Sequence, residues 1–99
     1  MDIKIHSLRF DADEKLLDFI ESKVNKLGQF YDHILAAEIT LRLDKSETHE
    51  NKVADIKLEI PGNDLFSKKQ AKSFEEATDL ATEAIRRQLK KTKEKQRGI

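Results

Sequence analysis

Apolar and polar residues alternate along three stretches of the chain with the two-residue period of a half-buried β-strand. Near the N-terminus, Ile3 and Ile5 alternate with polar neighbours. Residues 37–43 and 54–60 repeat the alternation on either side of a polar turn at residues 45–51. These patterns predict a short first strand and a later hairpin that has one dry face and one wet face.

Between the first strand and the hairpin, apolar residues recur at helical spacing. The apolar positions from Leu16 to Leu27 fall on one stripe of a helix. Asp11 or Asp13 is a candidate N-cap for this helix. Gly28 is its predicted end, because glycine readily adopts the left-handed conformation that closes many helices.

After the hairpin the chain turns, and a second helix follows. Pro61-Gly62 suits the central positions of a type II turn, which leads to a fourth strand predicted over roughly residues 64–70. Ser73, with Glu76 three residues later, forms a capping-box pattern that predicts a helix to about residue 93. The apolar face of this helix consists of Phe74, Ala77, Ala81, Ala84 and Ile85.

The predicted fold class is α+β, with the order β-α-β-β-β-α and one four-stranded sheet whose apolar face is covered by both helices. A chain of 99 residues suits a single domain, which we expect to span residues 1–99 with a basic, frayed tail from about residue 93. Apolar residues make up 37% of the chain and charged residues 38%, and the clear periodicity favours a folded domain over disorder.

The composition indicates a cytoplasmic protein. The chain has no cysteine, which excludes disulfides and thiolate chemistry and fits a reducing compartment. The N-terminus lacks the basic region and apolar run of a secretory signal, and nowhere do eighteen apolar residues follow one another. We therefore expect a protein that neither leaves the cytoplasm nor spans a membrane.

Charge is unevenly distributed along the chain, although the formal net charge is zero. Residues 84–99 contain seven basic side chains and one acidic side chain, a local charge of +6, which leaves −6 for the first 83 residues. Such asymmetry predicts an electrostatic footprint that is confined to one part of the surface.

The second helix arranges its basic residues in rows. Four of them follow one another at spacings of 4, 3 and 4 residues and are predicted to form a ridge opposite the apolar stripe: Arg86, Lys90, Lys93 and Arg97. Arg87 and Lys91 form a second row beside it. A helix dipole accounts for a few cations near a C-terminus, but this number exceeds that need and favours phosphate binding over a merely solvated face.

Lys23 and Lys26 on the first helix would extend this ridge if the two helices pack side by side. Scattered surface lysines on an ordinary amphipathic helix explain them equally well. A patch that includes both helices would be broad enough for folded RNA. The candidate RNA-binding residues are Lys23, Lys26, Arg86, Arg87, Lys90, Lys91 and Lys93.

Phe30 and Tyr31 follow the predicted end of the first helix, where an aromatic ring could stack on an exposed base. Packing at the sheet edge, as part of the core, is the favoured interpretation of this pair. No phenylalanine is expected on the polar face of a strand, so the sequence does not predict the stacking platform that reads single-stranded RNA.

Catalytic and metal-binding patterns are not found. His6, His33 and His49 lack the paired spacing of a metal site. The three glycines form no phosphate-cradling loop, and no nucleophile is paired with a base. We therefore expect a protein that is not an enzyme and has no cofactor, metal or small-molecule substrate.

Two segments carry a family resemblance. They are Lys23-Val24-Asn25-Lys26-Leu27 leading into Phe30-Tyr31-Asp32, and Asp79 with Ala84-Ile85-Arg86-Arg87-Gln88-Leu89-Lys90-Lys91-Thr92-Lys93. With the order of elements, they resemble the ribosome hibernation promoting factor and ribosome-associated inhibitor family, also called the sigma-54 modulation proteins. The chain departs from the family pattern at Ser7-Leu8-Arg9-Phe10 and at Ser73-Phe74.

The resemblance implies a domain, similar in outline to double-stranded RNA-binding domains, that lodges between the head and body of the small ribosomal subunit. There it would bind ribosomal RNA, exclude messenger and transfer RNA from the decoding region and inhibit translation as a hibernation factor of stress and stationary phase. Because the chain ends at Ile99, it resembles the short promoting type, which we expect to be monomeric off the ribosome.

Two alternatives stay open from the sequence. A generic double-stranded RNA-binding domain would use the same helices away from the ribosome, and it would bind arbitrary duplex RNA with equal affinity. A protein-interaction module would use its basic helix to contact an acidic partner, and its complexes would resist ribonuclease.

Overall fold

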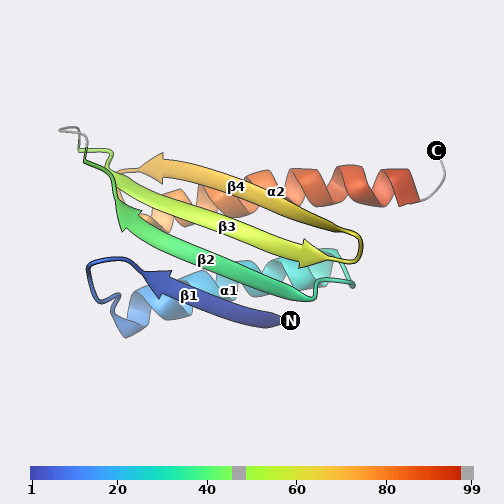
Figure 1. The fold of residues 1–99 in the computed structure, drawn as a ribbon, viewed down its shortest axis with the longest axis horizontal. Helices are drawn as coiled ribbons and strands as arrows, with labels where there is room; N and C mark the ends of the chain where they lie inside the picture. The colour runs from blue at the N-terminus through green and yellow to red at the C-terminus, as the bar shows by residue number, and fades with distance from the viewer. Residues whose placement is uncertain (46–48, 97–99) are drawn as a thin grey trace.

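The computed structural model describes residues 1–45 and 49–96, which form one four-stranded sheet and two helices (Figure 1). In chain order the elements are β1 (Asp2–Ser7), α1 (Glu14–Phe30), β2 (Ala36–Leu43), β3 (Lys52–Ile60), β4 (Asn63–Ala71) and α2 (Phe74–Gln96). This order confirms the predicted β-α-β-β-β-α arrangement, including the fourth strand. Part of the predicted turn at residues 45–51 and the basic Arg97 lie outside the described residues.

The strands lie side by side in the order β1-β2-β3-β4. β1 is parallel to β2, and α1 connects them, whereas β2, β3 and β4 are antiparallel neighbours. The register aligns Ile5 with Ile39, and Ile39 with Ile56, so apolar side chains continue across the sheet on one face.

Both helices cover this apolar face, while the other face is open to solvent (Figure 1). α2 packs on β3 and β4, and α1 lies beside α2. The largest fully buried side chains of this layer include Ile20, Val24, Ile39, Leu41, Ile56, Leu58, Ile85 and Leu89. Leu89 extends the predicted apolar stripe of α2 by one more turn. Neither helix in the described part of the chain is long and apolar enough to cross a membrane.

The first helix begins as predicted but ends later. Of the two candidate caps, Asp13 is the one used, and its Oδ1 accepts a hydrogen bond from the backbone N–H of Leu16 at 2.9 Å. The prediction that Gly28 ends α1 was wrong, because the helix continues to Phe30. Burial of Leu27 and Tyr31 on the sheet holds this last turn in place.

Gly28 has a different use inside the helix. A Cβ atom at this position would lie 3.2 Å from Cε of Met1, which is a close approach. The missing side chain therefore leaves room for the end of the Met1 side chain against α1. In contrast, Gly62 has a φ of 81°, as required at the third position of the predicted type II turn.

The start of α2 confirms half of the predicted capping box, since Ser73 Oγ accepts a hydrogen bond from the N–H of Glu76 at 3.0 Å. Next to this cap, the rings of Phe10 and Phe74 stack with centroids 4.9 Å apart. The two segments that depart from the family pattern therefore pack against each other.

Phe66 corrects a further expectation. It lies on the open face of β4, opposite Lys57 of β3, and 63% of its surface is exposed. The prediction that no phenylalanine occupies a polar strand face was wrong. The adjacent Leu65 takes the buried position, and side chains alternate along a strand, so Phe66 must point outward.

The packing of α2 predicts how its leucines differ. Leu89 is fully buried and Leu80 is 40% exposed on the same helix. We expect Leu89→Ala to lower the free energy of unfolding by about 3 kcal/mol, because the truncation leaves a cavity between helix and sheet. Leu80→Ala should change it by less than about 1 kcal/mol. Urea unfolding of both variants tests this, and equal losses would contradict the packing described.

Candidate nucleic-acid interface

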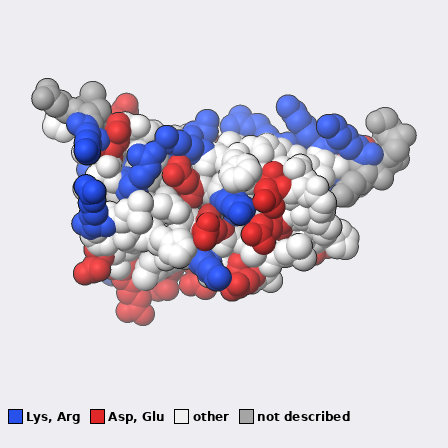
Figure 2. Space-filling model, viewed as in Figure 1, with Lys and Arg blue, Asp and Glu red and all other residues white. Residues whose placement is uncertain are grey.

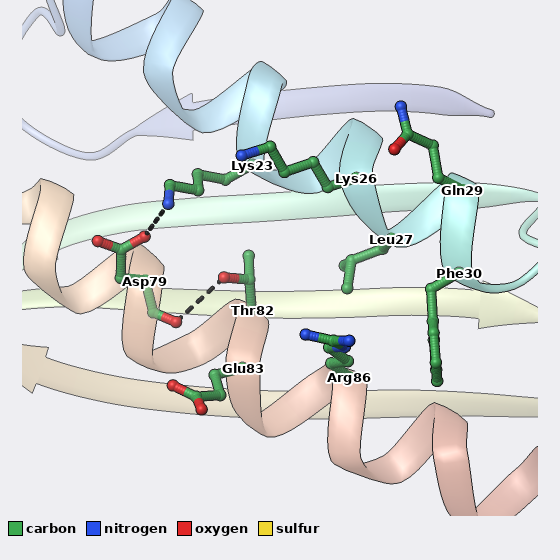
Figure 3. Close-up of a pocket in the computed structure, with 9 residues that line it drawn as sticks. All are labelled: Lys23, Lys26, Leu27, Gln29, Phe30, Asp79, Thr82, Glu83 and Arg86. Carbon is green, nitrogen blue, oxygen red and sulfur yellow. Dashed lines mark hydrogen bonds and ion pairs between the residues drawn. The ribbon is translucent and has the colours of Figure 1, made fainter.

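Three of the predicted basic residues, Lys23 and Lys26 of α1 and Arg86 of α2, meet at a groove between the two helices (Figure 3). The groove encloses a hollow of about 750 Å³. It is lined by Lys23, Lys26, Leu27, Gln29, Phe30, Asp79, Thr82, Glu83 and Arg86. The condition set by the sequence, that the helices lie side by side, is therefore met.

One lysine of the groove ties the two helices together. Nζ of Lys23 lies 2.8 Å from Oδ1 of Asp79, across the groove. The same ammonium group lies 5.5 Å from the ring centroid of Phe19. Lys23 is thus engaged within the protein, and an RNA phosphate would have to compete with Asp79 for it.

A second lysine ties the helices together farther along the chain. Nζ of Lys93 donates a hydrogen bond to the backbone oxygen of Phe30 at 3.0 Å. That oxygen belongs to the last residue of α1, where carbonyl groups lack helical partners and the helix dipole attracts a cation. Lys93 therefore satisfies the end of α1 from α2.

The ring of Phe30 lies between two cations of α2. Arg86 and Lys93 lie 5.2 Å and 4.7 Å from its centroid. The prediction that these two residues lie opposite the apolar stripe was wrong, because they flank the stripe on the side next to α1. Tyr31, only 3% exposed, belongs to the core, so the pair Phe30 and Tyr31 packs inside rather than offering a free ring to a base.

The remaining candidates point to solvent. Lys26, Arg87, Lys90 and Lys91 are exposed, and none forms an ion pair with another described residue. Among the seven candidates, these four are therefore the cations most available to a phosphate. Of these four, only Lys26 lines the groove, where the carboxylates of Asp79 and Glu83 reduce the positive charge.

Metal ligation has no support from this arrangement. Within residues 1–45 and 49–96, no group of three or more histidine and carboxylate side chains is placed to hold a metal ion. His6 instead lies 3.3 Å from Glu38 on the open face of the sheet.

Basic residues that the sequence reasoning missed lie on β4 and just after it. Lys68, Lys69 and Lys72 occur within residues 65–72, which contain no acidic residue. This run of positive charge could have indicated a basic surface from the sequence. It is short, however, and lies in the middle of an otherwise acidic stretch. Figure 2 shows lysine and arginine gathered along the upper edge of the molecule, over β4 and α2.

The chain is similar to known proteins along most of its length. The family model for sigma 54 modulation protein / S30EA ribosomal protein matches residues 3–97. A ribosome hibernation promotion factor of Bacillus subtilis is 28% identical over 97 residues, covering 96% of this chain and 50% of the relative. A ribosome hibernation promoting factor of Azotobacter vinelandii is 25% identical, covering 97% of this chain and 86% of the relative. The chain thus spans half the length of the first relative and most of the second.

A solved structure agrees with the fold. A ribosomal subunit interface protein from Coxiella burnetii has a TM-score of 0.84 and 22% identity to this chain. The likeness covers 94% of this chain and 98% of that one. It confirms the α+β fold with both helices on one side of the sheet.

The tie between Lys93 and Phe30 leads to a prediction about stability. Lys93→Ala should lower the free energy of unfolding by about 1 kcal/mol, because a half-buried, charge-assisted hydrogen bond to the end of α1 is lost. Lys90→Ala, three residues earlier on the exposed side, should change it by less than about 0.5 kcal/mol. Thermal unfolding of the two variants compares them, and indistinguishable midpoints would show that the tie contributes nothing.

Proposed function

The chain belongs to the sigma 54 modulation protein / S30EA ribosomal protein family, and we propose that it is a cytoplasmic ribosome hibernation factor that binds the small ribosomal subunit at the decoding region. Bound there, it would exclude transfer RNA and messenger RNA and thereby block translation. This mechanism requires no catalysis, no cofactor and no metal.

The observation that carries the proposal is the exposed basic surface of the helix pair. Lys26 on α1 and Arg87, Lys90 and Lys91 on α2 have no carboxylate partner among the described residues, so their charge is available to ribosomal RNA phosphates. Phosphate contacts set position and orientation without reading sequence, which suits recognition of folded RNA by shape.

Steric exclusion needs a body that does not deform, and the helix pair supports this requirement. Lys23 contacts Asp79, and Lys93 donates to the end of α1, so α1 and α2 are linked at two points besides their packing on the sheet. The fold extends over 46 × 24 × 18 Å. A rigid body of this size, lodged between the head and body of the small subunit, would occupy space that transfer RNAs and messenger need.

Cosedimentation with ribosomes tests the proposed surface. Lys26, Arg87, Lys90 and Lys91 are changed together to glutamate, and Lys23 and Lys93 are kept because they hold the fold together. We expect the wild type to travel with small subunits in a sucrose gradient and the folded variant to stay at the top. A matched control changes four other exposed cations to glutamate, namely Lys4, Arg9, Lys15 and Lys45.

The control variant should cosediment like the wild type, because it has the same net charge as the first variant but an intact helix surface. If neither wild type nor control cosediments, the ribosome assignment fails. If the first variant cosediments as well as the control, the ribosome assignment stands and the chosen surface is wrong.

Salt dependence supplies a second test. If about six phosphates are contacted, affinity for purified small subunits should fall by about a thousandfold between about 50 mM and about 200 mM salt. An affinity that barely changes with salt would contradict phosphate binding. Competition by an excess of arbitrary duplex RNA should leave the complex intact, whereas loss of the complex would favour a generic double-stranded RNA-binding domain.

A further inference from the structure

The outer edge of the sheet at β4 has basic residues that the helix surface does not include. Among the residues that the structure describes, β4 pairs with β3 alone, so its other edge has no strand partner there. Lys68 and Lys72 are exposed and Lys69 is half-buried, and none of them forms an ion pair with another described residue. Lys68 and Lys69 are neighbours in the strand and point to opposite faces, so the three cations without ion-pair partners flank this edge on both sides.

The basic edge continues onto α2. Nε2 of Gln88 donates a hydrogen bond to the backbone oxygen of Phe66 at 2.8 Å, so this part of α2 lies against β4. Arg87 precedes Gln88, and Lys91 follows it by three residues, which places Lys91 on a neighbouring part of the helix surface. Both are exposed, and Figure 2 shows the resulting basic strip over β4 and α2.

Two other cations of the open face differ, because they are paired with acids. Lys57 lies within 4.0 Å of Glu59 and Asp64, at 3.8 and 3.9 Å, and Arg42 lies 3.6 Å from Asp55. These two cations of the open face are therefore compensated by carboxylates, whereas Lys68, which points to the same side opposite Asp55, forms no ion pair with a described residue. Lys68, Lys69 and Lys72 place three cations without ion-pair partners close together at the β4 edge, so an attractive field for a polyanion builds up there.

An aromatic ring adds a second feature to the edge. Phe66 is 63% exposed and lies on the same face of β4 as Lys68. An exposed ring of this size is not needed for the core, which Leu65 fills from the same strand. Aromatic rings beside basic side chains are typical of surfaces on which nucleic-acid bases stack.

We propose that Phe66, Lys68, Lys69 and Lys72, together with Arg87 and Lys91, form a second RNA-binding surface, the β4-edge surface. It rests on the proposed function and deepens it. The domain then binds ribosomal RNA on both sides of α2, through the helix pair on one side and the β4 edge on the other. At the edge, the lysines bind phosphates and an unpaired base stacks on Phe66. The stacking ring favours RNA over an acidic protein segment as the occupant.

Another explanation exists for lysines at this position. Lysines on an edge strand discourage pairing with the edge of another sheet, which would protect the protein from self-association without any role in binding. The two explanations differ in what the removal of the lysines changes, which is RNA affinity in one case and oligomeric state in the other.

The test compares two double variants by their affinity for purified small subunits over a range of salt concentrations. In K68Q/K72Q, two exposed cations of the β4 edge are neutralised, and in the control K4Q/K15Q two exposed cations of β1 and α1 are neutralised. We expect the first variant to bind at least about tenfold more weakly at low salt and to reduce the slope of log affinity against log salt by about 2. The control should bind within about twofold of the wild type.

A separate variant tests the ring. Phe66→Ala should weaken binding by about tenfold while leaving the salt slope unchanged, because stacking releases no counterions. Leu35→Ala, which truncates another exposed apolar side chain, serves as the control and should bind like the wild type.

The outcomes separate this surface from the proposed function. If the wild type binds small subunits and K68Q/K72Q binds as well as K4Q/K15Q, the β4-edge surface is not an RNA site. Dimers or larger species of K68Q/K72Q in analytical ultracentrifugation, with unchanged affinity, would then assign the lysines to edge protection. If the wild type does not bind small subunits at all, the proposed function fails and this surface fails with it.

Discussion

Burial of one apolar sheet face beneath two neighbouring helices is the constraint on which the other features depend. The face formed by β2, β3 and β4 is too wide for a single helix to cover, so α1 and α2 must lie side by side on it. Their polar sides then face away from the sheet next to each other. This arrangement brings Lys23 and Lys26 to one groove with Arg86, which lies about sixty residues later in the chain.

The same packing divides the basic residues into two groups with different roles. Lys23 and Lys93 reach across to Asp79 and to the end of α1, and they hold the helix pair together. Lys26, Arg87, Lys90 and Lys91 remain exposed, with no carboxylate among the described residues in contact. A zero net charge is therefore compatible with a polyanionic partner, because compensation is local: Arg42 and Lys57 of the open face are paired with acids, whereas the four exposed cations of the helix pair are not.

Much of this fold follows from periodicity. Alternation predicted β1, β2 and β3, and the turn residues predicted β4, because each strand has one buried face and the pleat has a fixed period. The helix end predicted at Gly28 was wrong, since the burial of Tyr31 outweighs the local preference of glycine for a helix end. Phe66 and Lys93 could not be placed either, because the exposure of one and the cross-helix contact of the other depend on tertiary packing. The seven candidate RNA-binding residues all lie on the helix pair. Helical spacing could not show that some of them, such as Lys23 and Lys93, form contacts within the protein.

The central claim is that this domain and transfer RNA cannot occupy the small subunit together. The most direct measurement titrates the protein into small subunits that hold a short messenger and a fluorescent transfer RNA in the peptidyl site, and follows the bound fraction of transfer RNA. Steric exclusion predicts release of the transfer RNA as the protein binds, with the required protein concentration rising in proportion to free transfer RNA. A stable complex that retains both the protein and the transfer RNA would contradict it.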